Sequence, residues 1–72
     1  MKTKHFPVII EQDADGTFLV ECPVFKGCRS YGNSIDEAIN NIKEAIEVCL
    51  EDEVGLTDLP IFVGVRDLEL TL

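Results

Sequence analysis

The sequence predicts an α+β fold in which one helix lies on one face of a small, mostly antiparallel sheet, in the order β-β-β-α-β. Two observations predict the front half: an alternating apolar pattern typical of strands, and an acidic turn ending in glycine that is typical of a hairpin. A third is a single stretch with helical apolar spacing, followed by one more alternating stretch. A chain of 72 residues holds one small domain, which we place at residues 1–72.

The predicted hairpin joins "KHFPVIIEQ" (4–12) to "TFLVECPV" (17–24) through "DADG" (13–16). Phe6, Val8 and Ile10 share one face of the first strand because side chains alternate along a strand. Pro7 lacks an N–H, so this strand should lie at a sheet edge or begin pairing after the proline. A short third strand, "CRSYG" (28–32), follows a loop that contains proline and glycine.

The predicted helix covers residues 33–53, and Gly55 is its expected stop. Ser34 and Glu37 have the spacing of a capping box, in which each side chain bonds to the backbone N–H of the other residue. The apolar stripe of this helix has i, i+3, i+4 spacing and consists of Ile35, Ala38, Ile39, Ile42, Ala45, Ile46, Cys49 and Leu50.

The last predicted strand, "IFVGVRDLELTL" (61–72), changes the phase of its alternation, which indicates a bulge near Arg66–Asp67. A domain of this size buries only about 60% of its unfolded surface, so self-association is an expected supplement to its core. We therefore predict a homodimer or higher homo-oligomer that pairs through this terminal strand. The expected interface residues are Ile61, Val63, Val65, Leu68 and Leu70.

Fourteen acidic against six basic residues give a formal charge of −8. The six basic residues are scattered along the chain, so we expect no direct binding to nucleic acid and instead attraction to a basic protein. The first apolar run is far shorter than the roughly 7–15 residues of a signal-peptide core or the roughly 20 of a membrane span. We therefore expect a cytoplasmic protein without membrane contact, in a compartment that keeps thiols reduced.

The three cysteines, Cys22, Cys28 and Cys49, lack the close pairing typical of zinc or redox sites. His5 could complete a set of three cysteines and one histidine, but the spacing gives such a site little support. Cys22 and Cys49 fall on apolar faces and Cys28 adjoins a glycine, so we interpret all three as structural thiols. No metal and no cofactor is predicted.

Catalysis is also not predicted. His5 is a single histidine near the terminus, and it could act as a general base only with a carboxylate such as Glu11 or Glu21 nearby. The "DADG" stretch lacks the glutamate that a calcium loop needs at its twelfth position, which is Val24. A magnesium-dependent nuclease would need several carboxylates to converge, and nothing in the sequence requires them to meet; the candidates are Asp13, Asp15, Glu21 and Asp36.

The order of motifs resembles the HicB family of antitoxins, in particular short single-domain members without the C-terminal DNA-binding domain. The resemblance covers roughly residues 6–53 and depends on the series of motifs, since no single one is specific. The motifs are "DADG" (13–16), "PVFKGC" (23–28), "SYG" (30–32), "DEA" (36–38) and "NIKEAI" (41–46). Family members more often carry Leu-Pro where this chain has Phe25-Lys26, so this loop would contact a different partner or none.

The resemblance implies a partial ribonuclease-H-like fold without the nuclease site. It further implies inhibition of a small basic mRNA-cleaving toxin, HicA, by covering the active site of that toxin. Operator binding is not expected, because the chain stops after the fourth predicted strand. From charge and expected exposure, we predict the partner-binding residues Phe25, Lys26, Glu44, Glu47 and Glu51. The alternative is an orphan domain that acts as an oligomeric scaffold or small-ligand binder; a metal-dependent nuclease is a third, weaker hypothesis.

Overall fold

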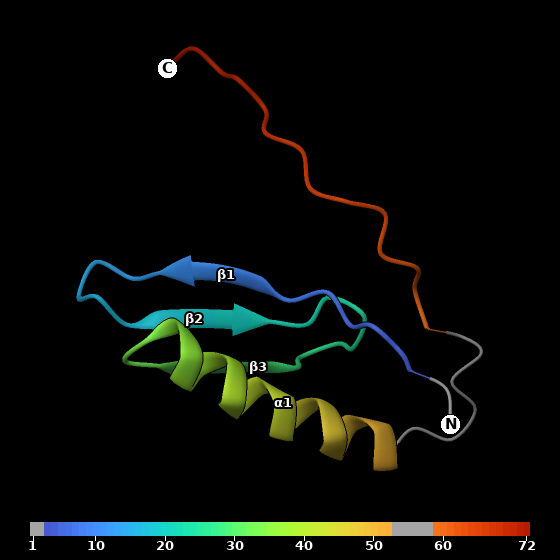
Figure 1. Cartoon of the computed structure of the whole chain (residues 1–72). Coiled ribbons are helices and arrows are strands. Elements are labelled where there is room, and N and C mark those ends of the chain that lie inside the picture. Colours follow the sequence, from blue (N-terminus) through green and yellow to red (C-terminus); the bar gives the residue numbers. More distant parts are fainter. Residues whose placement is uncertain (1–2, 53–58) are drawn as a thin grey trace.

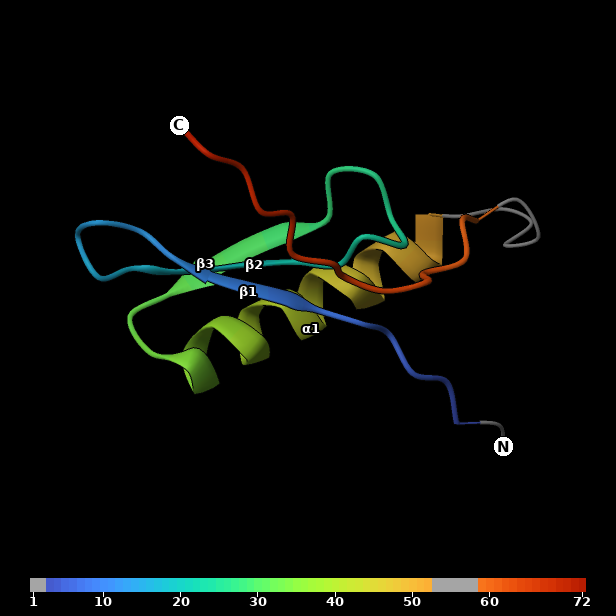
Figure 2. The ribbon, with the colours of Figure 1, turned by 90° about the horizontal axis from the view of Figure 1, so that it is seen from above.

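A computed structural model describes residues 3–52 and 59–72 of the chain. In these residues three strands precede one helix: β1 (Ile9–Gln12), β2 (Phe18–Glu21), β3 (Arg29–Gly32) and α1 (Ile35–Asp52). The strands form an antiparallel sheet in the order β1-β2-β3, and α1 lies against one of its faces (Figures 1 and 2). The predicted α+β class is thereby confirmed for the first four elements.

The register of the sheet determines which side chains meet the helix. Val20 pairs with Ile10 on one side and with Ser30 on the other, so these three positions share the face toward α1. Leu19, paired with Glu11 and Tyr31, belongs to the opposite face. The helical layer covers the first face, and the second face has no cover among the described residues (Figure 2).

The hairpin turn is held by local hydrogen bonds. The Asp13 N–H donates to the Thr17 carbonyl at 2.8 Å, and the Gly16 N–H donates to the Asp13 carbonyl at 2.9 Å. Gly16 has a φ of +96°, which residues with a Cβ rarely adopt. The Asp15 carboxylate accepts a bond of 2.9 Å from the Thr17 N–H, and this bond lowers the pKa of Asp15. The "DADG" segment is therefore a turn, as predicted.

The helix begins with one half of the predicted capping box, because in the described residues no hydrogen bond joins the Ser34 N–H to the Glu37 carboxylate. The Glu37 N–H donates to the Ser34 hydroxyl at 3.1 Å, and the Ala38 N–H donates to the Ser34 carbonyl at 3.0 Å. Asp36 and Glu37 lie in the first turn, near the positive end of the helix dipole. The expected stop at Gly55 lies outside the described residues.

We expect Ser34→Ala to lower the free energy of unfolding by about 1 kcal/mol, because the Glu37 N–H loses its acceptor. Chemical denaturation followed by circular dichroism would measure the change. Ser34→Asp supplies another capping oxygen and should keep most of the stability. Equal losses in the two variants would contradict a capping role for Ser34.

The core is small and lies between α1 and the two strands β2 and β3. Its buried members are Val20, Cys22, Phe25, Cys28, Ala38, Ile42 and Ile46. The helical stripe predicted from the sequence supplies Ala38, Ile42 and Ile46 to it, whereas Ile35 at the helix start is 46% exposed. Because α1 packs chiefly on β3 and β2, Ile10 in β1 and Val8 just before β1 are only partly covered.

The strand predicted at residues 61–72 is not formed in the chain, although all twelve positions are described. Beyond Leu59, which packs against the core, this segment has no regular secondary structure and leads away from the domain on the β1 side of the sheet (Figure 1). Its apolar side chains are exposed, Ile61 by 88% and Val63 by 95%. The alternating pattern is a property of the segment, but a strand also needs a neighbour with which to pair.

Candidate functional site

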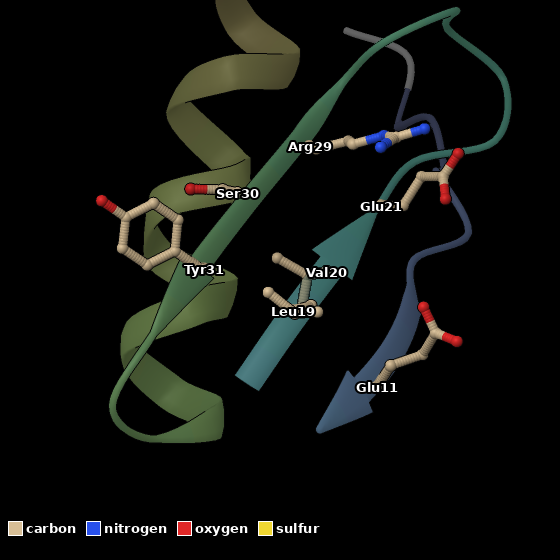
Figure 3. Close-up of a pocket in the computed structure, with 7 residues that line it drawn as sticks. All are labelled: Glu11, Leu19, Val20, Glu21, Arg29, Ser30 and Tyr31. Carbon is tan, nitrogen blue, oxygen red and sulfur yellow. The ribbon is translucent and has the colours of Figure 1, made fainter. Parts of the chain in front are cut away.

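The uncovered face of the sheet contains a shallow hollow of about 520 Å³ (Figure 3). Its floor is the Leu19 side chain, with Tyr31 on one side, where it is 67% exposed. Glu21 and Arg29 occupy opposite positions on β2 and β3 at one end, and Glu11 stands on β1. The hollow therefore offers an apolar and aromatic floor with charges of both signs at its rim.

The outer face of α1 carries the acidic residues predicted to meet a partner. Glu44, Glu47 and Glu51 are all exposed, at spacings that place them along one side of the helix. Lys26 is exposed as well, in the β2–β3 loop at the end of the sheet near the C-terminal half of α1 (Figure 1). Contact of any of these residues with a partner stays a prediction.

The side chain of Phe25 was predicted to lie on the loop surface, but it is buried. It is 2% exposed, and the centroid of its ring lies 5.8 Å from the centroid of the Phe6 ring. The β2–β3 loop curls inward through two bonds of 3.3 Å: the Phe25 N–H donates to the Cys22 carbonyl, and the Cys28 N–H donates to the Phe25 carbonyl. The phenyl ring thus belongs to the core, and Phe25 offers no side-chain surface to a partner. The available sequence signal was the position of Phe25 in a short loop between Cys22 and Cys28, two residues interpreted as structural thiols.

All three cysteines are free thiols in the core region: Cys22 and Cys28 are buried and Cys49 is half-buried. Their positions confirm the packing role expected for Cys22 and Cys49. Burial raises the pKa of Cys28 to about 12, with the Cys49 side chain and the neighbouring Cys22 adding to the effect. Cys28 is therefore neutral at physiological pH and a poor nucleophile.

We expect Cys28 to be alkylated far more slowly in the folded protein than in urea. A pKa of about 12 in place of 9.0 reduces the thiolate fraction at pH 8 about a thousandfold, and burial restricts access further. Iodoacetamide labelling followed by peptide mass spectrometry measures this ratio, with the unfolded chain as the control. The folded thiol keeps its proton between pH 9 and 12 while the unfolded thiol loses it, so the contribution of Cys28 to stability disappears over that range. Equal labelling rates in the two states would contradict this environment.

The candidate catalytic and metal-binding residues are not brought together. His5, Asp13, Asp15 and Asp36 are exposed, and Glu21 is half-buried on the open sheet face. In the described residues no three side chains of histidine, cysteine, aspartate or glutamate form a group suited to a metal ion. This part of the chain also contains no helix long and apolar enough to cross a membrane.

A second hollow, which the sequence alone did not indicate, is an apolar groove of about 320 Å³ between α1 and the residues that precede β1. We call it the β1 groove. Lys43 and Glu47 stand at its rim, and its apolar lining consists of Phe6, Val8, Ile39, Ile42, Ile46 and Leu50. It exists because α1 packs on β2 and β3 and leaves β1 without a helical cover.

These features define a class: a small acidic α+β domain with an open sheet face, an exposed acidic helix face and an apolar groove. A family model described as "HicB_like antitoxin of bacterial toxin-antitoxin system" matches residues 6–61. The chain therefore belongs to the HicB-like antitoxin family of bacterial toxin–antitoxin systems, as the motifs predicted.

Relatives of similar length support this assignment. A UPF0150 protein of Synechocystis sp. is 44% identical over 66 residues, which is 92% of this chain and 94% of the relative. A UPF0150 protein of Archaeoglobus fulgidus is 38% identical over 65 residues, 90% of this chain and 93% of the relative. No solved structure matches the chain. The partial ribonuclease-H-like fold stays a prediction.

Proposed function

We propose that this chain is a non-enzymatic cytoplasmic antitoxin that binds a small basic HicA-like toxin and covers its mRNA-cleaving site. The observation that carries the proposal is the family match over residues 6–61. A toxin–antitoxin family implies a toxin as partner, and an RNA-cleaving toxin needs a basic surface for its substrate. An acidic inhibitor competes for that surface by charge.

The outer face of α1 is the surface that best suits this role. Glu44, Glu47 and Glu51 lie on it, and Lys43 is the one basic residue of the helix. The excess of exposed carboxylates over this single lysine produces a negative field that steers a basic partner toward the helix. Lys26 is the predicted contact in the neighbouring loop, while the burial of Phe25 removes its side chain from the proposed surface.

Charge reversal tests this surface. The probe is the product of a short basic reading frame adjacent to the gene for this chain, if the genome contains one, and titration calorimetry at low salt gives the dissociation constant. We expect Glu44→Lys with Glu47→Lys to weaken binding about a hundredfold, and the difference to shrink as salt is added. Because Glu47 also lies at the β1 groove, the mass of each variant is checked by light scattering.

The matched control reverses two exposed acids on the hairpin, Glu11→Lys with Asp13→Lys, with the same change of net charge. This control should lose much less affinity, since its charges lie away from α1. A larger loss of affinity in the control would indicate that the partner binds the open sheet face around Glu11 and not the outer face of α1. Unchanged affinity in both variants would refute the electrostatic surface.

The open-face hollow favours a second candidate, a domain without a toxin that binds a small ligand. Its volume of about 520 Å³ is within the usual range of ligand sites, about 300–1,000 Å³, although it is shallow. Tyr31 on its wall could stack on a planar ligand, and Arg29 could pair with an acidic group. Capture of a stoichiometric small molecule with the purified protein, together with no binding to the neighbouring basic protein, would support this alternative.

A further inference from the structure

The C-terminal segment 60–72 exposes a row of apolar side chains to solvent. Most of its exposed apolar side chains alternate in the manner of a half-buried strand, in two phases; they are Ile61, Val63, Val65, Leu68, Leu70 and Leu72. Phe62, which lies out of phase, is the least exposed of the apolar side chains here at 38%. Single exposed apolar residues are common on proteins, but a continuous row of them marks an interaction surface. The segment therefore needs a partner that supplies both apolar cover and backbone hydrogen bonds.

The domain has a free strand edge and an apolar groove, which together suit an added strand with apolar side chains. In the described residues β1 pairs with β2 only, so the outer edge of β1 presents free backbone N–H and C=O groups. The β1 groove lies beside the residues that lead into this edge, Phe6 and Val8, and is lined almost wholly by apolar side chains. A strand placed along β1 would satisfy the free backbone groups and direct every second side chain into the groove.

We propose that segment 60–72 of one copy adds as a fourth strand to the β1 edge of a second copy and fills its β1 groove, so that two copies exchange their C-terminal segments. Val63 and its neighbours Ile61 and Val65 would supply the side chains that enter the groove. This inference does not depend on a toxin.

The direction of the segment favours a second copy over the chain's own groove. After Leu59 docks on its own core, the segment does not return along its own β1 but continues outward past that edge (Figure 1). The segment thus leaves its own groove unoccupied and extends beyond the β1 edge. A two-fold axis there places each segment on the β1 edge of the other copy, which gives a closed interface in which both edges are used.

The small core of the domain is a reason to expect association between copies. The buried core is limited to seven side chains among the described residues, without a disulfide among the three cysteines. Domains this small commonly depend on association for part of their stability. The exchange would bury the exposed apolar row of each segment and the apolar lining of each groove. Each copy would be stabilised both by the segment that it donates and by the segment that it accepts.

The first experiment compares full-length variants by light scattering and native mass spectrometry. The unmodified chain should have twice its mass of 8.0 kDa at tens of micromolar. Val63→Glu should raise the dissociation constant about a hundredfold or more, because each dimer contains the change twice. The matched control is Val48→Glu at an exposed helix position outside the groove, which should leave the mass unchanged.

Complementation distinguishes exchange from a segment that folds onto its own groove. Ile39→Glu damages the groove, and Val63→Glu damages the segment. Each variant alone should be monomeric, but a mixture should form heterodimers, because one intact segment then meets one intact groove. A mixture that stays monomeric would overturn the exchange, as would a monomeric unmodified chain or a dimer unaffected by Val63→Glu.

Hydrogen exchange of the unmodified chain gives a result that does not depend on how variants fold. Residues 6–12 and 60–70 should gain amide protection together as the protein concentration rises through the dissociation constant. Protection of both segments that is independent of concentration would assign the groove to the chain's own segment. Protection of the first segment only after addition of an apolar ligand or the basic protein would assign the groove to that occupant. Either outcome would refute the proposal.

Discussion

Phe25→Ala should lower the free energy of unfolding by about 3–5 kcal/mol, because it removes a ring that is 2% exposed and leaves a cavity against Phe6. A chain of 72 residues has a total stability of about 4–11 kcal/mol. The variant is therefore expected to lose a large part of this stability, and at the low end of the range it would lie close to its unfolding midpoint at room temperature. Urea denaturation monitored by circular dichroism, at one fixed protein concentration, measures the loss.

The adjacent residue supplies the control. Lys26→Ala changes an exposed side chain in the same loop and should alter stability by no more than about 0.5 kcal/mol. Phe25→Leu keeps an apolar filling and should lose less than Phe25→Ala. If Phe25→Ala proved as stable as Lys26→Ala, the ring would have to lie on the surface, where it could again be considered for partner binding.

Gly32→Ala should be the second severe change, with a loss of about 3 kcal/mol. A Cβ at Gly32 would lie 2.5 Å from the Ala38 nitrogen and 3.0 Å from both the Ala38 Cα and the Glu37 carbonyl carbon. These are backbone atoms at the start of α1, so no side-chain rotation relieves the overlap. The helix would have to move away from β3, which places the loss at the upper end of the usual overpacking range.

Gly64→Ala is the matched control, because a Cβ at that position meets no atom of the chain within 4 Å. Its thermal midpoint should stay near that of the unmodified protein, while that of Gly32→Ala should fall by more than ten degrees. Removing the Ala38 methyl in Gly32→Ala with Ala38→Gly should not restore stability, since the obstacle is backbone. Recovery in that double variant would contradict the proposed cause.

The sequence was sufficient for elements that local chemistry determines. Turn residues with glycine predicted the hairpin, and the Ser34 cap with its apolar stripe predicted the helix to within a few residues. The position of Pro7 correctly indicated an edge strand whose pairing begins later, at Ile9. Motif order also predicted the family, because the spacing of turns and cap reflects the whole β-β-β-α unit.

Other features depend on contacts between distant parts of the chain. Phe25 carries no periodic signal, since it lies in a loop, and only the inward curl of that loop places its ring in the core. The groove arises from the lateral position of α1 over the sheet, which alternation along one strand cannot specify. The segment after Leu59 has a strand pattern without a strand, because pairing needs a neighbour beyond the pattern itself.

The packing of each element against its neighbour in sequence has a consequence for how the chain reaches its fold. β1 pairs with β2, β2 pairs with β3, and α1 packs most closely on β3, the strand that directly precedes it. Contacts between near neighbours in sequence close short loops, so we expect faster folding than for a sheet with crossover connections. Residues 29–52 can form their contacts without waiting for either end of the chain. Folding of this unit would therefore be a unimolecular phase that precedes any encounter between molecules.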